Sequence, residues 1–200
     1  MPSSRRLPIA VAVLLLLATG SPSPAAAHPH VWIDAVTTFV VKAGMVTGIR
    51  VEWTFDEFFS TTLLDDFDVN RDKRFDAKEI AALEKDAFGR TAAQGYFTFV
   101  KVDGAALKGL AAKEFTARVD KGIVHYSYLL PFPHPVDPRK AALTVTYYED
   151  SYYIDVAPAE HGPVRFDGDG SLTCTGTVAE DPKTTIYFNS VHPLTVTLHC

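Results

Sequence analysis

The chain is dominated by short runs in which apolar and polar residues alternate, the pattern of half-buried β-strands. Two long runs, Val31 to Lys42 and Met45 to Phe55, are separated only by Ala43-Gly44 and predict a β-hairpin. Ile123 to Leu130 alternates in the same way, and the proline-rich Pro131 to Pro135 predicts a rigid turn after it.

Further strand-like runs follow at regular spacing and are separated by turn residues such as Asp-Gly and Lys-Gly. These runs are Tyr96–Val102, Glu114–Val119, Leu143–Tyr148, Tyr152–Val156, Ser171–Val178, Thr184–Phe188 and Leu194–Leu198. Such spacing predicts a mainly β (α+β) fold, an antiparallel β-sandwich, in one domain over residues 28–200.

One stretch, from about residue 56 to 89, has a helical period instead. Phe59, Leu63 and Phe67 recur every fourth residue behind Asp56, which is placed to cap a helix. A second apolar set continues the same period, and Gly89 is the expected stop. This set consists of Ile80, Leu83 and Ala87. We therefore expect a helix–loop–helix insertion in the β domain.

The twelve residues between these helices, Asp68 to Glu79, have the side-chain pattern of an EF-hand calcium loop. Oxygen-bearing side chains stand at its first, third, fifth, ninth and twelfth positions, and the residue at the seventh would contribute its carbonyl. The candidate calcium ligands are Asp68, Asn70, Asp72, Arg74 (through its carbonyl), Asp76 and Glu79. Ca²⁺ prefers six to eight such oxygens, so the pattern predicts calcium binding.

The loop departs from the EF-hand pattern at its sixth position, where Lys73 replaces glycine. A side chain in the left-handed conformation costs roughly 1–2 kcal/mol, and the lysine adds a positive charge near the cation. We expect weak calcium binding. The alternative is a solvated acidic loop between two helices.

The first 27 residues resemble a secretory signal peptide. Arg5 and Arg6 precede an apolar core, and Ala25-Ala26-Ala27 fits the cleavage rule. The core is too short to span a bilayer, and no later stretch is long and apolar enough to do so. The sequence thus predicts an exported, periplasmic protein that does not span the membrane after cleavage.

Charge and cysteine content narrow the class of protein. The formal net charge is −5, without a basic run, which argues against a nucleic-acid partner. Cys174 and Cys200 are the two cysteines, and in an oxidising compartment we expect them to form a disulfide rather than remain free thiols.

Cleavage after residue 27 would expose His28-Pro29-His30 as the new N-terminus. A terminal histidine offers an amine and an imidazole, which suit Cu²⁺, Ni²⁺, Co²⁺ or Zn²⁺. Asp34 would share a strand face with His30, and His125 is a possible further ligand from elsewhere in the fold. The candidate transition-metal ligands are therefore His28, His30, Asp34 and His125, and the alternative is that they are ordinary polar surface residues.

Several segments together resemble a bacterial family. They are His28–Asp34 (HPHVWID), Trp53–Ser60 (WTFDEFFS), the acidic loop, and Tyr148–Tyr153 (YEDSYY). Over nearly the whole mature chain the sequence is similar to the family known as domain of unknown function 1007, often labelled the periplasmic component of an uncharacterised ABC-type transport system. The resemblance implies a link to metal handling beside an inner-membrane nickel/cobalt-type transporter or exporter; Lys73, where many such loops carry glycine, puts calcium affinity in question.

These observations favour a periplasmic metal-binding accessory protein over two alternatives. One is a calcium-stabilised structural or interaction module of a membrane transport system. The other is a copper redox enzyme with a histidine brace, which is disfavoured because no hydrolase elbow, zinc-protease motif, phosphate loop or paired nucleophile and base is present.

Overall fold

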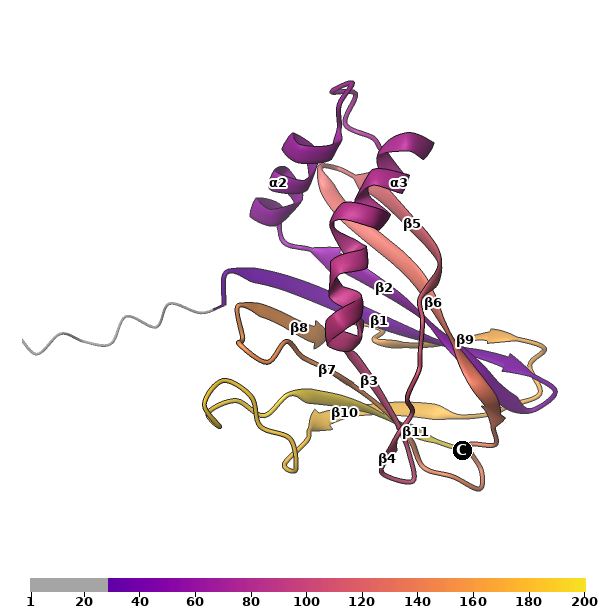
Figure 1. Cartoon of the computed structure of the whole chain (residues 1–200). Helices are drawn as coiled ribbons and strands as arrows, with labels where there is room; N and C mark the ends of the chain where they lie inside the picture. Colours follow the sequence, from indigo (N-terminus) through magenta and orange to yellow (C-terminus); the bar gives the residue numbers. More distant parts are fainter. Residues whose placement is uncertain (1–28) are drawn as a thin grey trace, which may run out of the picture.

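A computed structural model describes residues 29–200 as two packed β-sheets with helices at one end (Figure 1). The larger sheet, sheet A, has the strand order β5-β6-β2-β1-β8. β9 also pairs with β1, along the part of β1 that follows the part paired with β8. Its strands are β1 (Val31–Lys42), β2 (Met45–Phe55), β5 (Lys113–Asp120), β6 (Ile123–Val136), β8 (Ile154–Pro158) and β9 (Val164–Gly168). The pairs are antiparallel except β1 with β8 and β1 with β9, which are parallel.

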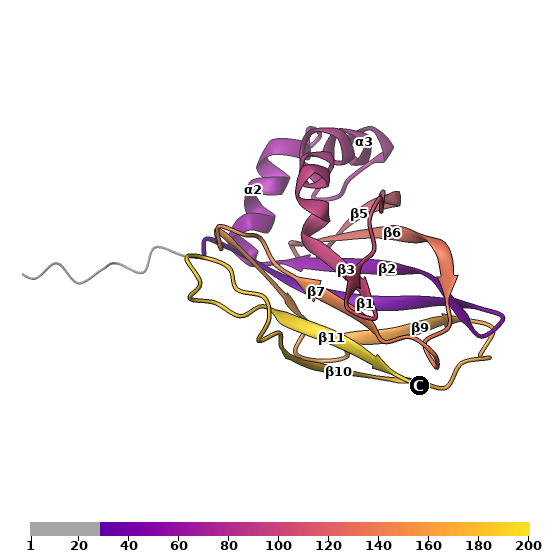
Figure 2. The same ribbon diagram turned by 60° about the horizontal axis from the view of Figure 1, so that its bottom comes forward.

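The second sheet, sheet B, has the order β10-β11-β7-β3-β4 and only antiparallel pairs. Its strands are β3 (Thr98–Val102), β4 (Ala105–Ala106), β7 (Leu143–Tyr147), β10 (Thr175–Glu180) and β11 (Leu194–His199). Seen from the side, the two sheets form separate layers (Figure 2), and the predicted mainly β, antiparallel-rich sandwich is confirmed.

The helical insertion follows β2. Its elements are α2 (Glu57–Phe67), α3 (Ala77–Asp86) and the 3₁₀ helix η1 (Phe88–Phe97). Asp56 caps α2 by accepting a hydrogen bond from the Phe59 amide at 2.8 Å, as its position before the helix predicts. The buried Ser60 hydroxyl accepts the Val124 amide of β6 at 3.0 Å, so the insertion is tied directly to sheet A.

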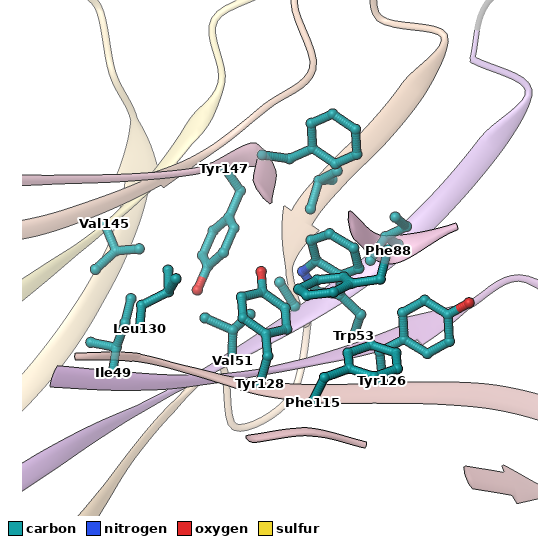
Figure 3. Close-up of a cluster of buried hydrophobic side chains, with 14 of the residues drawn as sticks. Ile49, Val51, Trp53, Phe88, Phe115, Tyr126, Tyr128, Leu130, Val145 and Tyr147 are labelled. Atoms are coloured by element: carbon teal, nitrogen blue, oxygen red, sulfur yellow. The ribbon is translucent and has the colours of Figure 1, made fainter. Parts of the chain in front are cut away.

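The core has two parts because the inner face of sheet A is covered by two different layers. Ile49, Leu130 and Val145 lie where sheet A faces sheet B, whereas Phe88 of η1 packs on Phe115 where the helices cover it (Figure 3). Trp53 lies between the two parts. Its ring is 5.9 Å from that of Phe97, 5.9 Å from that of Phe88 and 5.2 Å from that of Tyr128.

Three expectations about local structure are wrong. Thr184 to Phe188 is not a strand; among the described residues it holds only a single bridge, from Ile186 to Val191. Pro131 to Pro135 continues β6 instead of turning, with an irregularity opposite Val46 and Gly48 where prolines cannot donate to the ladder. The helical segment does not stop at Gly89, because η1 continues to Phe97 and bends at Gln94, Gly95 and Tyr96.

The disulfide at the C-terminal end fits the expectation for an exported protein. Cys174 and Cys200 form the predicted disulfide, which ties the last residue to the start of β10. Bonds of this kind persist in extracytoplasmic compartments. Within residues 29–200, no helix has the length and apolar composition needed to cross a membrane. The predicted signal peptide, residues 1–27, lies outside the described residues.

Buried side-chain hydrogen bonds join the two sheets. The hydroxyls of Thr37 on β1 and Tyr147 on β7 are 2.5 Å apart, and those of Thr98 on β3 and Tyr128 on β6 are 3.0 Å apart. Tyr147→Phe should lower the free energy of unfolding by about 1–3 kcal/mol, because the Thr37 hydroxyl is left buried and unpaired. The double variant Thr37→Val/Tyr147→Phe should recover part of that loss. Urea unfolding of the two single variants and the double variant measures this, and strictly additive losses would contradict it.

Candidate functional site

The Asp68–Glu79 loop lies between α2 and α3 and is organised around its first residue. Asp68 is buried, and its carboxylate accepts the Asp72 amide at 3.1 Å and the Lys73 amide at 2.8 Å. Lys73 has φ 63°, the left-handed conformation for which glycine is ordinarily used. The loop thus makes the sharp turn that the EF-hand pattern requires at its sixth position, with a lysine carrying the conformational strain.

The last residue of the loop, Glu79, also turns its carboxylate toward the loop backbone. Glu79 is buried, and its carboxylate accepts the Val69 amide at 2.9 Å and the Asp76 amide at 2.8 Å. Asp76 caps α3 through the amides of Lys78 and Glu79 and forms a capping box with Glu79. These amides lower the pKa of Asp76, so its carboxylate is charged at neutral pH.

The middle positions also turn toward the loop backbone. The Asn70 side chain accepts the Asp72 amide at 2.8 Å, and Asp72 accepts the Arg74 amide at 2.9 Å. Each carboxylate has about four lone-pair positions, so acceptor capacity remains for a cation. In the described part of the chain, however, no three His, Cys, Asp or Glu side chains gather closely enough to hold a metal ion.

A cleft of about 890 Å³ opens beside the loop, between α2 and the β5–β6 turn. Its walls carry acidic side chains from α2 and the first residue of the loop, and basic ones from the rest of the loop and the turn. They include Glu57, Asp65 and Asp68 on the acidic side and Arg71, Lys73 and Lys121 on the basic side. Solvent and small ions therefore reach the loop from this side.

The candidate transition-metal ligands do not converge. His28 lies outside the described residues. His30 and Asp34 are both exposed, and they share the outer face of sheet A as predicted. Asp34 pairs with Thr54, and Thr54 in turn pairs with His125, so two strand spacings of together about 10 Å separate Asp34 from His125.

The surroundings of His125 disfavour a cation. Its Nδ1 is hydrogen-bonded to the Thr54 hydroxyl at 3.0 Å, and Arg118 stands opposite it on β5. Burial and the charge of Arg118 lower the pKa of His125, so its ring is neutral at pH 7. The described part of the predicted set is therefore spread across the outer face of sheet A without forming one centre.

His30 is instead held by the loop that precedes β8. The amides of His30 and Val31 donate to the Tyr153 carbonyl at 2.9 and 3.3 Å, and the His30 and Tyr153 rings are 4.8 Å apart. Glu149 organises this loop, since its carboxylate accepts the Ser151 hydroxyl at 2.6 Å and the Tyr153 amide at 3.0 Å. Sequence reasoning missed this role. The available signal was an acidic residue two positions after a strand, with a serine two positions later.

A second residue that sequence reasoning missed is Asp155 on β8. It pairs with Trp32 on the outer face and accepts a hydrogen bond from the Tyr152 hydroxyl at 3.3 Å. Burial raises the pKa of Asp155, and the charge of Asp34 raises it further, although the Tyr152 hydrogen bond opposes both. The start of β1 is thus surrounded by carboxylates and aromatic rings.

Fold and site together define a class: a disulfide-bonded, mainly β sandwich of the kind that fits an extracytoplasmic protein, with a helix–loop–helix insertion that carries an acidic loop. Residues 13–195 match the model of the family described as "Protein of unknown function (DUF1007)", and the chain belongs to that family.

Its relatives carry no functional name. An "Uncharacterized protein" of Haemophilus influenzae is 27% identical over 170 residues, which cover 82% of this chain and 80% of the relative. The "Uncharacterized 15.5 kDa protein in trpE 3'region" of Spirochaeta aurantia is 27% identical over 132 residues, 64% of this chain and 91% of the relative. No solved structure matches the chain. The comparisons therefore give a family and no activity.

Glu149 makes the 149–154 loop sensitive to acid. Burial opposes ionisation of its carboxyl group, but the Ser151 side chain and the amides of Ser151, Ile154 and Tyr153 outweigh burial and lower its pKa below the usual 4.5. A group with a lowered folded-state pKa stabilises the fold above its unfolded value, and that stability is lost as pH falls through the folded value. Its contribution should therefore be complete above about pH 5.5 and fall progressively below pH 4.5.

Glu149→Gln removes this titration, so the stability difference between wild type and variant should shrink as the pH is lowered from 6 to about 3. Denaturant unfolding at a series of pH values measures it. The difference in unfolding free energy between wild type and variant cancels the contributions of the other carboxylates with lowered pKa. Asp137 and Asp181 are among them and contribute equally to both proteins. A difference independent of pH would contradict the assignment.

Proposed function

We propose that this protein is an exported metal-binding accessory protein whose helical insertion is ordered by Ca²⁺. The observation that carries the proposal is the Asp68 carboxylate accepting the Asp72 and Lys73 amides while Lys73 adopts φ 63°. A loop needs this turn to point alternate oxygens at one centre, and here the chain adopts it against the preference of a lysine.

The residues that would hold the ion are those of the predicted loop. Asp68, Asn70 and Asp72 lie on one side and Asp76 and Glu79 on the other, with the Arg74 carbonyl between them in sequence. A divalent cation would supply positive charge to carboxylates that otherwise repel one another. The chain's own part is to fix both ends of the loop, through the Asp56 cap on α2 and the capping box on α3.

The role of the insertion separates two versions of the proposal. A carrier of nickel, cobalt, zinc or copper for an inner-membrane transporter needs His28 and His30 to act at the mature N-terminus. A calcium-stabilised interaction module needs only the loop and a docked insertion. The Ser60–Val124 hydrogen bond and the separation of Asp34 from His125 favour the module.

Calcium should raise the melting temperature of the protein by several degrees relative to the same protein in EDTA, because an ion that binds only the folded state stabilises it by mass action. Glu79→Gln should abolish this rise. Glutamine at that position retains the capping box but removes the charge and the bidentate carboxylate. Calorimetry with and without Ca²⁺ measures both.

Glu84→Gln is the matched control, since it removes an exposed glutamate from the same helix and should keep the full calcium shift. A shift that survives in Glu79→Gln, or its absence in the wild type, overturns the calcium assignment. The same melts with Ni²⁺, Co²⁺, Cu²⁺ and Zn²⁺ on protein with its native N-terminus test the carrier version. A shift lost in His30→Ala supports the carrier.

Lys73→Gly should strengthen calcium binding at least severalfold, because it removes a positive charge from the loop and relieves a left-handed side chain worth roughly 1–2 kcal/mol. Lys121→Gly is the matched control. Lys121 has φ 51° in the β5–β6 turn and loses the same charge and strain outside the loop, on the facing wall of the cleft, so its effect on calcium affinity should be clearly smaller. Calcium titration by isothermal calorimetry compares them, and equal effects of the two variants on affinity would refute a site at the loop.

A further inference from the structure

Large aromatic side chains are exposed at one end of the sandwich, where β1 begins and α2 starts. Phe188 is 92% exposed, Phe58 is 79% exposed and Trp32 is 51% exposed. Trp32 is joined to the start of α2 through Asp56, which accepts the Trp32 amide at 2.9 Å and donates its own amide to the Trp32 carbonyl at 3.0 Å. Exposed rings gathered in one place mark an interaction surface more often than rings scattered singly.

Phe188 stands on a strained tip. Tyr187, Phe188 and Asn189 all have positive φ, at 47°, 56° and 63°. Left-handed backbone of this kind is unfavourable at each non-glycine residue, and such strain persists mainly at functional sites. The tip is held by the Tyr187 amide, which donates to the Asp150 carbonyl at 3.1 Å, and by the bridge between Ile186 and Val191. The chain thus maintains a strained conformation that leaves a phenylalanine in solvent.

Between this tip and β8 lies a cleft of about 250 Å³. That volume suits one long side chain rather than a whole small ligand, since ligand pockets span roughly 300–1,000 Å³. Figure 1 shows β8 beside the loop that joins β10 to β11, at the end where the described chain begins. β8 is the last strand of sheet A here, and one of its edges faces the cleft.

The backbone of β8 presents hydrogen-bonding groups to that cleft. The Ala159 amide donates to Ala35 of β1, and the Tyr153 carbonyl accepts from His30 and Val31, so odd-numbered residues face β1. Alternation along the strand then directs the amide and carbonyl of Val156 away from β1, toward the cleft. An edge of this kind accepts an added strand from another chain.

The cleft selects positive charge. Its lining includes the carboxylates of Glu149, Asp155 and Glu180, and the part of the chain that the structure describes contributes no lysine or arginine to it. His192 also lines it, and its Nδ1 lies 3.0 Å from the Thr184 carbonyl. The tyrosine rings of residues 147, 148 and 152 complete the wall, and ring faces attract ammonium and guanidinium groups.

We propose that this cleft and the aromatic residues Trp32, Phe58 and Phe188 dock an extended segment of a partner protein, which adds as a strand to β8 and places a lysine or arginine side chain in the cleft. Charge complementarity argues for this occupant. A second copy of this acidic chain would bring like charge to the cleft, and an anionic lipid surface would be repelled by its carboxylates.

The probe is a fluorescent, end-capped octapeptide of alternating threonine and arginine, because alternation in a strand puts every arginine on one face. It should bind saturably by fluorescence anisotropy, and its affinity should fall as salt is raised. Three comparison probes should bind much more weakly: the peptide with glutamate for arginine, the peptide methylated at every backbone nitrogen, and free arginine amide. Equal binding of the methylated peptide would exclude strand addition, and equal binding of arginine amide would indicate a small-cation site instead.

Asp155→Asn/Glu180→Gln should weaken binding of the arginine peptide about tenfold or more, because the guanidinium group loses two facing carboxylates, one partly buried and one exposed. Glu84→Gln/Asp86→Asn removes two exposed carboxylates from α3 and should leave affinity unchanged. Phe188→Ser tests the strained tip and should weaken binding at unaltered melting temperature. The single variant Glu180→Gln changes only an exposed residue, so it provides the measurement if the double variant misfolds.

Equal losses in the two double variants would reduce the effect to overall charge and overturn the proposal, as would wild-type affinity in Phe188→Ser together with Glu180→Gln. Concentration-dependent dimerisation that Phe188→Ser abolishes would show that a second copy occupies the surface instead. None of these readouts needs calcium, so the docking site and the loop can fail independently.

Discussion

The structure depends on the inner face of sheet A being covered twice, by sheet B along one half and by the helical insertion along the other. Trp53 lies at the boundary, with Phe97 and Phe88 from η1 on its rings and Tyr128 of β6 edge-on beside it. Among residues 29–200, neither the buried indole nitrogen nor the buried Tyr126 hydroxyl has a hydrogen-bond partner. Both groups are surrounded by rings, whose faces accept N–H and O–H groups only weakly.

This arrangement makes the insertion a docked element and not an independent domain. Ser60-Thr61-Thr62 gives α2 a low intrinsic helix propensity, so its stability comes from packing of Leu63 and from the Ser60–Val124 hydrogen bond. The loop is anchored by the same helices. Order in the loop, docking of α2 and the position of the β5–β6 hairpin are therefore linked, because hydrogen bonds join the loop to Glu79 of α3 and α2 to Val124 of β6.

Local patterns in the sequence predicted the parts of the fold that local physics determines. The alternation of β1 and β2 gave both strands with their observed bounds, and the EF-hand-like spacing gave the turn at Lys73, because twelve consecutive residues contain all its information. β9 was missed because its apolar alternation is limited to Val164 and Phe166, and the segment becomes a strand by pairing with the distant β1. Thr184–Phe188 has the composition of a strand, but its successive left-handed residues prevent an extended conformation.

Sites built from segments far apart in the sequence could not be predicted, because local patterns do not determine which strands become neighbours. Whether His30, Asp34 and His125 meet depends on strand order, and the register inserts Thr54 between the last two. The cleft beside β8 likewise joins residues from β7, β8 and the β10–β11 loop, whose proximity no spacing encodes. Asp56 connects α2 to the start of β1, because one of its carboxylate oxygens caps α2 and the other accepts the Trp32 amide. Because this single carboxylate holds both segments, a change in the direction of α2 must be transmitted to the start of β1. Such a change would first reach the exposed aromatic residues at Trp32.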